Sequence, residues 1–143
     1  MTRPRYAWMT TVPVEKSQAE LMTLLGRHGV TDLATTHSAA RGSAIRFRIG
    51  ARWFEVAIGR PLWDEIQNDY QNTRGTVVEN IEQEYRRRWR AQLMLLRMKL
   101  EFIETGESTV ETEFMSSLLL ESGRTLAEVI SDNGIPLLAA SIG

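Results

Sequence analysis

The sequence predicts an α+β protein in which a small three-stranded antiparallel sheet packs on one long helix, with short helices near both ends. Three observations predict this arrangement. Residues 76–105 contain no Gly or Pro, two runs of alternating apolar residues flank Gly50-Ala51, and short capped segments occur near each end of the chain. The 143 residues fit a single domain, 1–143, that is large enough to bury a core.

The composition is typical of a soluble globular protein, with 43% hydrophobic and 24% charged residues. The absence of cysteine excludes disulfides, thiolate metal sites and cysteine nucleophiles. The longest apolar stretch, Leu93–Leu100, contains Arg97 and Lys99 and is too short for a membrane span. With no secretory signal apparent, we expect a cytoplasmic protein without a membrane partner.

The first elements follow from local patterns. Residues 1–13 are expected to be an irregular lead-in, because Pro13 disfavours an early helix. The run 17–20 resembles a capping box with Ser17 as N-cap, and it predicts a helix that ends at Gly29. Residues 30–37 favour a strand, and the small polar residues 38–43 favour a loop.

A β-hairpin is predicted with a defined register. Gly50-Ala51 suits a two-residue type II′ turn, and residues on both sides alternate with period two. The turn pairs Phe47 with Phe54 and Arg48 with Trp53. One face of the hairpin is then apolar. The other face carries Arg46, Arg48, Trp53 and Glu55.

Residues 62–75 suggest one or two helical turns followed by a loop. Thr76 then opens a capping box and a helix that continues to Gly106. Its core stripe is predicted to be Val78, Ile81, Tyr85, Trp89, Leu93, Leu96, Leu100 and Ile103. A second stripe holds Met94, Leu95, Met98 and Phe102. We therefore expect the C-terminal half to be covered on two sides and the arginine-rich half to project into solvent.

Two short helices are predicted after the long one. Ser108 opens a capping box for an amphipathic helix that contains Val110 and Phe114 and ends at Gly123. Thr125 opens another, for a helix closed by Asn133-Gly134. The tail 135–143 begins with apolar residues, so it is expected to dock on the domain rather than extend freely.

Catalysis has little support in the sequence. The two histidines, His28 and His37, fall in different predicted elements, and a His at a helix end usually completes the C-terminus. No HExxH, Gly-rich phosphate loop or GxSxG motif is present. We expect a non-enzymatic protein with no catalytic residues, no metal site and no cofactor.

Basic residues suggest nucleic-acid binding. Residues 41–99 carry 12 basic and 7 acidic side chains, whereas residues 100–143 carry 1 basic and 8 acidic ones. Arg86, Arg90 and Arg97 share one stripe of the long helix, and arginine beside an exposed aromatic suits phosphates and unpaired bases. The candidate binding residues are Arg46, Arg48, Trp53, Arg86, Arg87, Arg90 and Arg97.

Two alternatives remain open. Arg, Trp, Tyr and Met near the long helix are typical of protein interfaces, so the partner can be a protein or a second copy forming a homodimer. The second alternative is that the arginines form a salt-bridged face and the opposite charges neutralise each other within the fold.

Three segments resemble a small, widespread family of uncharacterised phage and prophage proteins. They are the helix from Tyr85-Arg86-Arg87-Arg88-Trp89-Arg90-Ala91 through Lys99-Leu100-Glu101, then Thr112-Glu113-Phe114 and Ser122-Gly123-Arg124-Thr125. The resemblance covers roughly residues 13–138 and implies an intracellular accessory protein of phage origin. Its partner would be nucleic acid or a host protein, such as a component of transcription or defence machinery. The family supplies no site residues.

Overall fold

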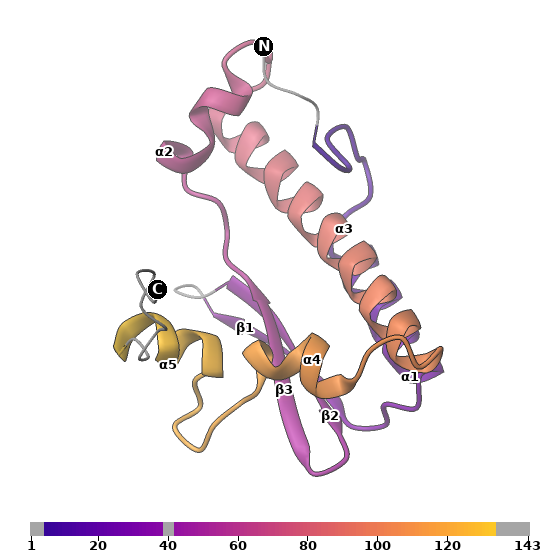
Figure 1. The fold of residues 1–143 in the computed structure, drawn as a ribbon. Coiled ribbons are helices and arrows are strands. Elements are labelled where there is room, and N and C mark those ends of the chain that lie inside the picture. The colour runs from indigo at the N-terminus through magenta and orange to yellow at the C-terminus, as the bar shows by residue number, and fades with distance from the viewer. Residues whose placement is uncertain (1–4, 39–41, 134–143) are drawn as a thin grey trace, which may run out of the picture.

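The computed structural model describes residues 5–38 and 42–133. Its centre is an antiparallel sheet of order β1-β2-β3, formed by β1 (Leu33–Ser38), β2 (Gly42–Ile49) and β3 (Arg52–Ile58). The long helix α3 (Val77–Glu104) lies over one face of this sheet, with α1 (Val14–Arg27) beside it (Figure 1). The α+β class and the three-stranded sheet are therefore confirmed.

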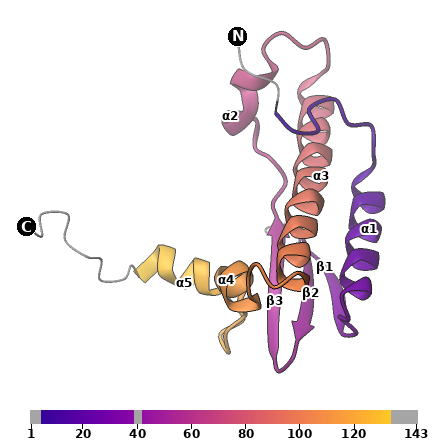
Figure 2. The same cartoon turned by 45° about the vertical axis from the view of Figure 1, so that its right-hand side comes forward.

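The remaining elements are short. The helix α2 (Trp63–Ile66) continues as the 3-10 turn η1 (Gln67–Tyr70), and both lie near the N-terminal end of α3. After α3 come α4 (Val110–Phe114), the 3-10 turn η2 (Met115–Ser117) and α5 (Leu126–Asn133). Figure 2 shows α5 on the side of the molecule opposite α1.

The predicted hairpin is present with its predicted register, including Phe47 opposite Phe54 and Arg48 opposite Trp53. Gly50 has a φ of +64°, which the first position of a type II′ turn requires. On the inner face, the ring centroids of Phe47 and Phe54 are 5.7 Å apart. Phe114 of α4 meets both rings, at 5.6 and 5.9 Å, so α4 closes this end of the core.

The core stripe of α3 is largely as predicted, since Tyr85, Trp89, Leu93, Leu96 and Leu100 are buried. They pack with Leu21 and Leu25 of α1 and with the inner face of the sheet. Val78 was assigned wrongly to this stripe, because its side chain is 68% exposed. The first turns of α3 extend beyond the sheet, so no strand lies under Val78 (Figure 1).

Two boundaries near the N-terminus differ from the prediction. The helix α1 begins at Val14 with Pro13 as its N-cap, and Ser17 lies inside the helix, fully buried. The assignment of Ser17 as N-cap was therefore wrong, and Pro13 suits a helix start because its φ is fixed near −60°. The strand β1 begins at Leu33 rather than at residue 30, since Val30 donates its N–H to Leu25 and closes α1. The predicted loop at 38–43 is shorter, because Ser38 and Ser43 belong to strands.

The C-terminal region was predicted in part. Thr76 and Thr125 accept the expected capping hydrogen bonds, from Glu79 and Glu128. Thr109, not Ser108, caps α4, which ends at Phe114 rather than near Gly123. The helix stops there because Leu118 turns to form a β-bridge beside Phe54. The tail 135–143 lies outside the described residues.

Candidate functional site

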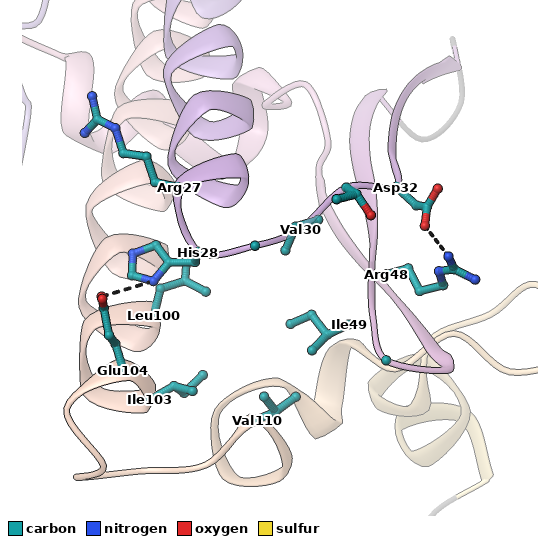
Figure 3. Close-up of a pocket in the computed structure, with 13 residues that line it drawn as sticks. Arg27, His28, Val30, Asp32, Arg48, Ile49, Leu100, Ile103, Glu104 and Val110 are labelled. Atoms are coloured by element: carbon teal, nitrogen blue, oxygen red, sulfur yellow. Dashed lines mark hydrogen bonds and ion pairs between the residues drawn. The ribbon is translucent and has the colours of Figure 1, made fainter.

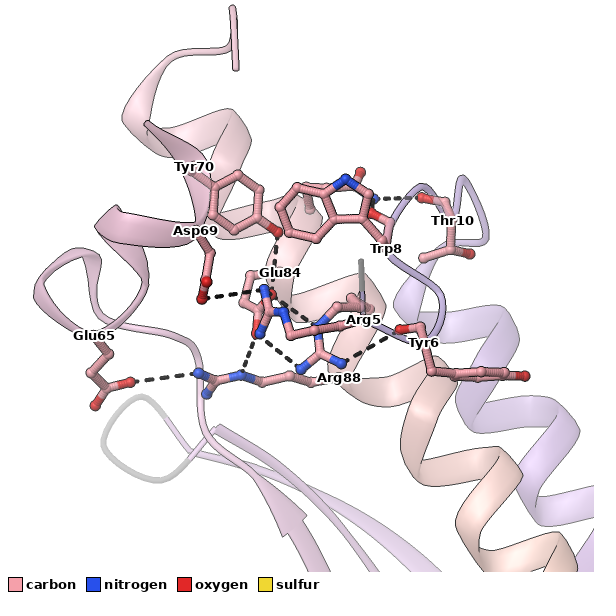
Figure 4. Close-up of polar contacts among 11 residues, drawn as sticks. Arg5, Tyr6, Trp8, Thr10, Glu65, Asp69, Tyr70, Glu84 and Arg88 are labelled. Carbon is pink, nitrogen blue, oxygen red and sulfur yellow. Dashed lines mark hydrogen bonds and ion pairs between the residues drawn. The ribbon is translucent and has the colours of Figure 1, made fainter. Parts of the chain in front are cut away.

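A buried carboxylate organises the arginine-rich half of α3. Glu84 is fully buried and accepts hydrogen bonds from Arg87 at 3.0 and 3.1 Å and from Arg88 at 3.0 Å. Arg5 of the N-terminal segment adds two more, at 2.8 and 3.1 Å. The Tyr70 hydroxyl donates to the same carboxylate at 3.2 Å. Figure 4 shows Arg5, Arg88 and Tyr70 converging on Glu84.

The electrostatics of this cluster fix its protonation. Burial raises the pKa of Glu84, but the hydrogen bonds from Arg87, Arg88 and Arg5 outweigh it and hold that pKa at about 2. Burial and then the adjacent Glu84 carboxylate raise the pKa of Tyr70 to about 12. At neutral pH the cluster therefore holds an ionised glutamate and a neutral tyrosine that donates to it.

The same cluster ties the N-terminal segment to α3. Arg5 also lies 3.6 Å from Asp69, and Arg88 lies 3.7 Å from Glu65, so three cations face three carboxylates. The Gln83 side chain donates to the carbonyl oxygens of Trp8 and Thr10 at 3.2 and 2.8 Å. The expectation that this half of α3 projects into solvent was wrong, because residues 5–12 and η1 cover it.

The three arginines predicted to form one cationic stripe have different environments. Arg86 donates to the Gln83 side chain at 2.7 Å. Arg90 forms an ion pair with Glu20 of α1. Arg97 is exposed and forms no ion pair within the part of the chain that is described. Arg87 is mostly buried against Glu84, with a side chain only 14% exposed. Arg86, Arg87 and Arg90 therefore each contact another residue of the fold, whereas Arg97 points to solvent apart from them.

Replacing Arg90 with Glu is expected to lower the free energy of unfolding by about 1 kcal/mol, because two carboxylates then face each other where α1 meets α3. The pair is about one-quarter to one-third exposed, which limits the effect. Urea unfolding of Arg90→Glu, Glu20→Arg and the double exchange measures the coupling. Recovery of stability in the double exchange confirms the pair, and additive losses contradict it.

The outer face of the hairpin is also internally paired. Arg46 donates to Glu55 on the neighbouring strand at 3.1 Å, and Arg48 forms an ion pair with Asp32. Trp53 lies opposite Arg48 and is 38% exposed, on the side away from Phe47 and Phe54 as predicted. A partner role for Trp53 stays a prediction.

Most of the second apolar stripe of α3 is exposed. Leu95, Met98 and Phe102 are 49%, 43% and 40% exposed, so the expectation that this half is covered on two sides was wrong. At about 100° per residue they share one side of α3 with Ala91. We call Ala91, Leu95, Met98 and Phe102 the α3 seam. The core stripe lies on another side of the helix, which explains why α1 and the sheet leave the seam uncovered.

A groove runs between the upper part of the seam and strand β3. Its volume is about 430 Å³, and we call it the β3 groove. One wall is formed by Ala57, Ile58 and Gly59 at the end of β3. The facing wall is α3, with Arg87, Arg88, Ala91, Gln92 and Leu95. The groove therefore joins an apolar helix surface to a strand edge, with arginines at one end.

A second cavity of about 420 Å³ lies where α1, the hairpin tip and the end of α3 meet (Figure 3). Val30, Ile49 and Leu100 form its apolar part. His28, the C-cap of α1, lies 3.3 Å from Glu104 on one side, while Arg48 pairs with Asp32 on the other. The cavity is therefore bordered by two pairs of oppositely charged or ionisable groups, and Arg27 also lines it.

Comparison of the chain with protein-family models, curated proteins and solved structures finds no match. The phage resemblance therefore stays an expectation. Within residues 5–38 and 42–133, no group of three or more acidic or histidine side chains is arranged to hold a metal ion. No helix in those ranges combines the length and apolarity needed to cross a membrane.

Proposed function

We propose that this chain is a non-enzymatic, protein-binding accessory protein that docks a partner protein on the α3 seam. The observation that carries the proposal is the exposure of Leu95, Met98 and Phe102 on one side of a helix whose other apolar stripe is buried. Clustered apolar side chains at the surface mark interaction sites in soluble proteins. Met and aromatic residues are enriched in the buried centres of interfaces.

The internal pairing of the arginines favours this function over nucleic-acid binding. Affinity for nucleic acid depends on cations that are free to replace the counterions of phosphates. Arg46, Arg48, Arg87 and Arg90 each contact a carboxylate of the fold. Of the arginines predicted to bind phosphate, Arg97 is the one that is exposed without an ion pair among the described residues.

The class of partner follows from the phage resemblance and is part of the proposal. A small accessory protein that docks on a host enzyme complex, in transcription or in defence, can block or redirect it through one apolar surface. Self-association through the seam is the competing outcome. It would depend on the concentration of this protein alone, whereas docking on a host enzyme complex also needs the partner.

A binding screen with a matched pair of variants tests the proposal. The immobilised protein selects binders from a library of displayed random peptides, and these peptides are then measured against variants. The double variant Met98→Glu/Phe102→Glu is expected to weaken binding by about tenfold or more, because charges replace the apolar contact. The control, Met9→Glu/Val78→Glu, changes exposed apolar residues elsewhere on the surface and is expected to bind like the unchanged protein.

Nucleic acid forms the second arm of the same test. Single-stranded and duplex oligonucleotides are titrated at about 50 and 200 mM salt, where phosphate contacts lose affinity steeply. We expect no salt-dependent binding. Tight oligonucleotide binding that is lost on Arg97→Glu, with peptide binding insensitive to the seam variant, would overturn the proposal in favour of a nucleic-acid partner.

A further inference from the structure

We infer that the β3 groove receives an extended peptide segment of a partner protein, which adds to the sheet as a fourth strand beside β3. The inference rests on the proposed function, since it specifies the form in which a partner contacts this side of the molecule. The inference differs from the proposed function in the kind of contact that binds the partner. The seam offers side chains, whereas the strand edge offers backbone hydrogen bonds, a known mode of peptide recognition.

The direction of the β3 backbone identifies the groups that are open. Leu119 donates its N–H to the carbonyl oxygen of Trp53 at 2.8 Å, so Trp53 points its backbone groups away from β2. In an antiparallel pair, alternate residues point both backbone groups to the same side. Ala57, four residues on, therefore also points its N–H and carbonyl away from β2.

Only the first part of this edge is occupied. Leu118 forms a single antiparallel bridge beside Phe54, and on the side toward Ala57 the edge meets the 3-10 turn η2, which precedes Leu118 and does not continue the pairing. Beyond that bridge, no segment of the described chain pairs with the outer side of β3. Pairing with β2 continues without a bulge to Ile58, so the strand stays regular up to the groove.

Beyond the bridge, the described residues supply none of the features that normally protect an unpaired strand. Natural sheets protect edges with Lys, Pro, bulges or a covering segment. Ala57 is exposed and small, and β3 contains no proline, since Pro61 follows only after the strand has ended at Ile58. A peptide backbone can therefore approach Ala57 without displacing a side chain of residues 5–38 or 42–133.

The facing wall specifies the side chains that would fit. One alternate set of side chains on an added strand points toward α3, where Ala91 and Leu95 are apolar. Arg88 stands at one end of the groove, where it already donates to Glu84 at 3.0 Å and lies 3.7 Å from Glu65. The partner segment is thus extended, with an apolar residue on the face that meets Ala91 and Leu95.

Proline substitution tests the backbone contact and has a matched control in this chain. Ala57→Pro removes the outward N–H and leaves the bonds to β2, as proline is tolerated where its nitrogen faces solvent. The backbone groups of Thr35 in β1 also point away from β2. The Asp32 carbonyl accepts from the Arg48 N–H and so points toward β2, and the direction alternates along β1, which turns Thr35 outward. With the peptides selected by the unchanged protein as probe, Ala57→Pro is expected to bind about tenfold more weakly and Thr35→Pro within about twofold.

Amide hydrogen exchange of the unchanged protein supplies a readout that does not depend on variant folding. Exchange at Ala57 is expected to slow by about tenfold when the peptide saturates the protein, while exchange at Thr35 stays the same. No slowing at Ala57 would overturn the inference. Protection of Ala57 before peptide is added would also overturn it, by showing that the chain or a second copy already covers the edge.

The outcomes separate this inference from the proposed function. If Met98→Glu/Phe102→Glu abolishes peptide binding and Ala57→Pro leaves it unchanged, strand addition is wrong and seam docking stands. If neither variant weakens binding, both are wrong.

Discussion

Replacing Phe54 with Ala is expected to lower the free energy of unfolding by about 3–5 kcal/mol, the usual cost of truncating a fully buried aromatic residue. Phe54 has no exposed surface, and its ring lies within contact of Phe47 and Phe114. The loss therefore opens a cavity where β3, β2 and α4 meet. Urea unfolding followed by circular dichroism measures it.

Val78→Ala is the control for Phe54→Ala, because Val78 is exposed at the far end of α3. Its expected effect is within about 0.5 kcal/mol. A loss below about 1 kcal/mol for Phe54→Ala would mean that the inner face of the hairpin is not the core.

The second large effect is expected at Glu84. Glu84→Gln should lower the free energy of unfolding by about 3 kcal/mol at pH 7, because it leaves arginines without their buried counter-charge. Arg5 and Arg88 still reach solvent, which places the loss at the lower end of the range for broken buried pairs. Glu101→Gln, an exposed position on the same helix, should change little.

The Glu84 contribution should also depend on pH. The folded pKa of Glu84, about 2, lies below its ordinary value of 4.5. A depressed folded pKa means that the stabilisation is fully present above about pH 4.5 and is lost as the pH falls toward 2. The difference between the unchanged protein and Glu84→Gln should therefore shrink steadily from pH 5 to pH 3. A difference that stays constant over this range would contradict the ionised, hydrogen-bonded Glu84 described above.

Local patterns were sufficient to predict the hairpin and the long helix. Gly50 fixes the turn, and the turn together with the alternation fixes every pair along β2 and β3. The Thr76 capping box and Gly106 mark the ends of α3 within about two residues. Such features act between near neighbours in the chain, so the sequence displays them directly.

The failures involve contacts between distant residues. Glu84 and Arg88 are four residues apart on one helical face, a spacing that favours an ion pair, and they form one. It does not reveal that Arg5 and Tyr70, far away in the chain, enclose Glu84. Similarly, nothing local shows that Ser17 is buried inside α1 or that the chain leaves the helix after Phe114 to place Leu118 beside Phe54.

The same limitation affected the candidate site. Arg86 and Arg90 suggested a free cationic surface because the partner of Arg86, Gln83, is uncharged and the partner of Arg90, Glu20, belongs to another helix. Arg87 pairs with Glu84 on its own helix, but the burial of this pair depends on Arg5 and Tyr70. The exposed seam was present in the sequence as a second apolar stripe, but an amphipathic pattern alone does not show whether another element covers it. Only the packing of α1 and the sheet on one side of α3 distinguishes the buried stripe from the exposed one.

The central claim is that a partner docks on α3 through the seam, not through the arginines. Chemical-shift mapping of the isotopically labelled protein with a selected peptide tests this most directly. The account predicts the largest changes at Leu95, Met98 and Phe102, with no comparable change on addition of an oligonucleotide. Large changes confined to Arg97 and to the hairpin residues Arg46, Arg48 and Trp53 on oligonucleotide addition, with the seam unaffected by peptide, would contradict it.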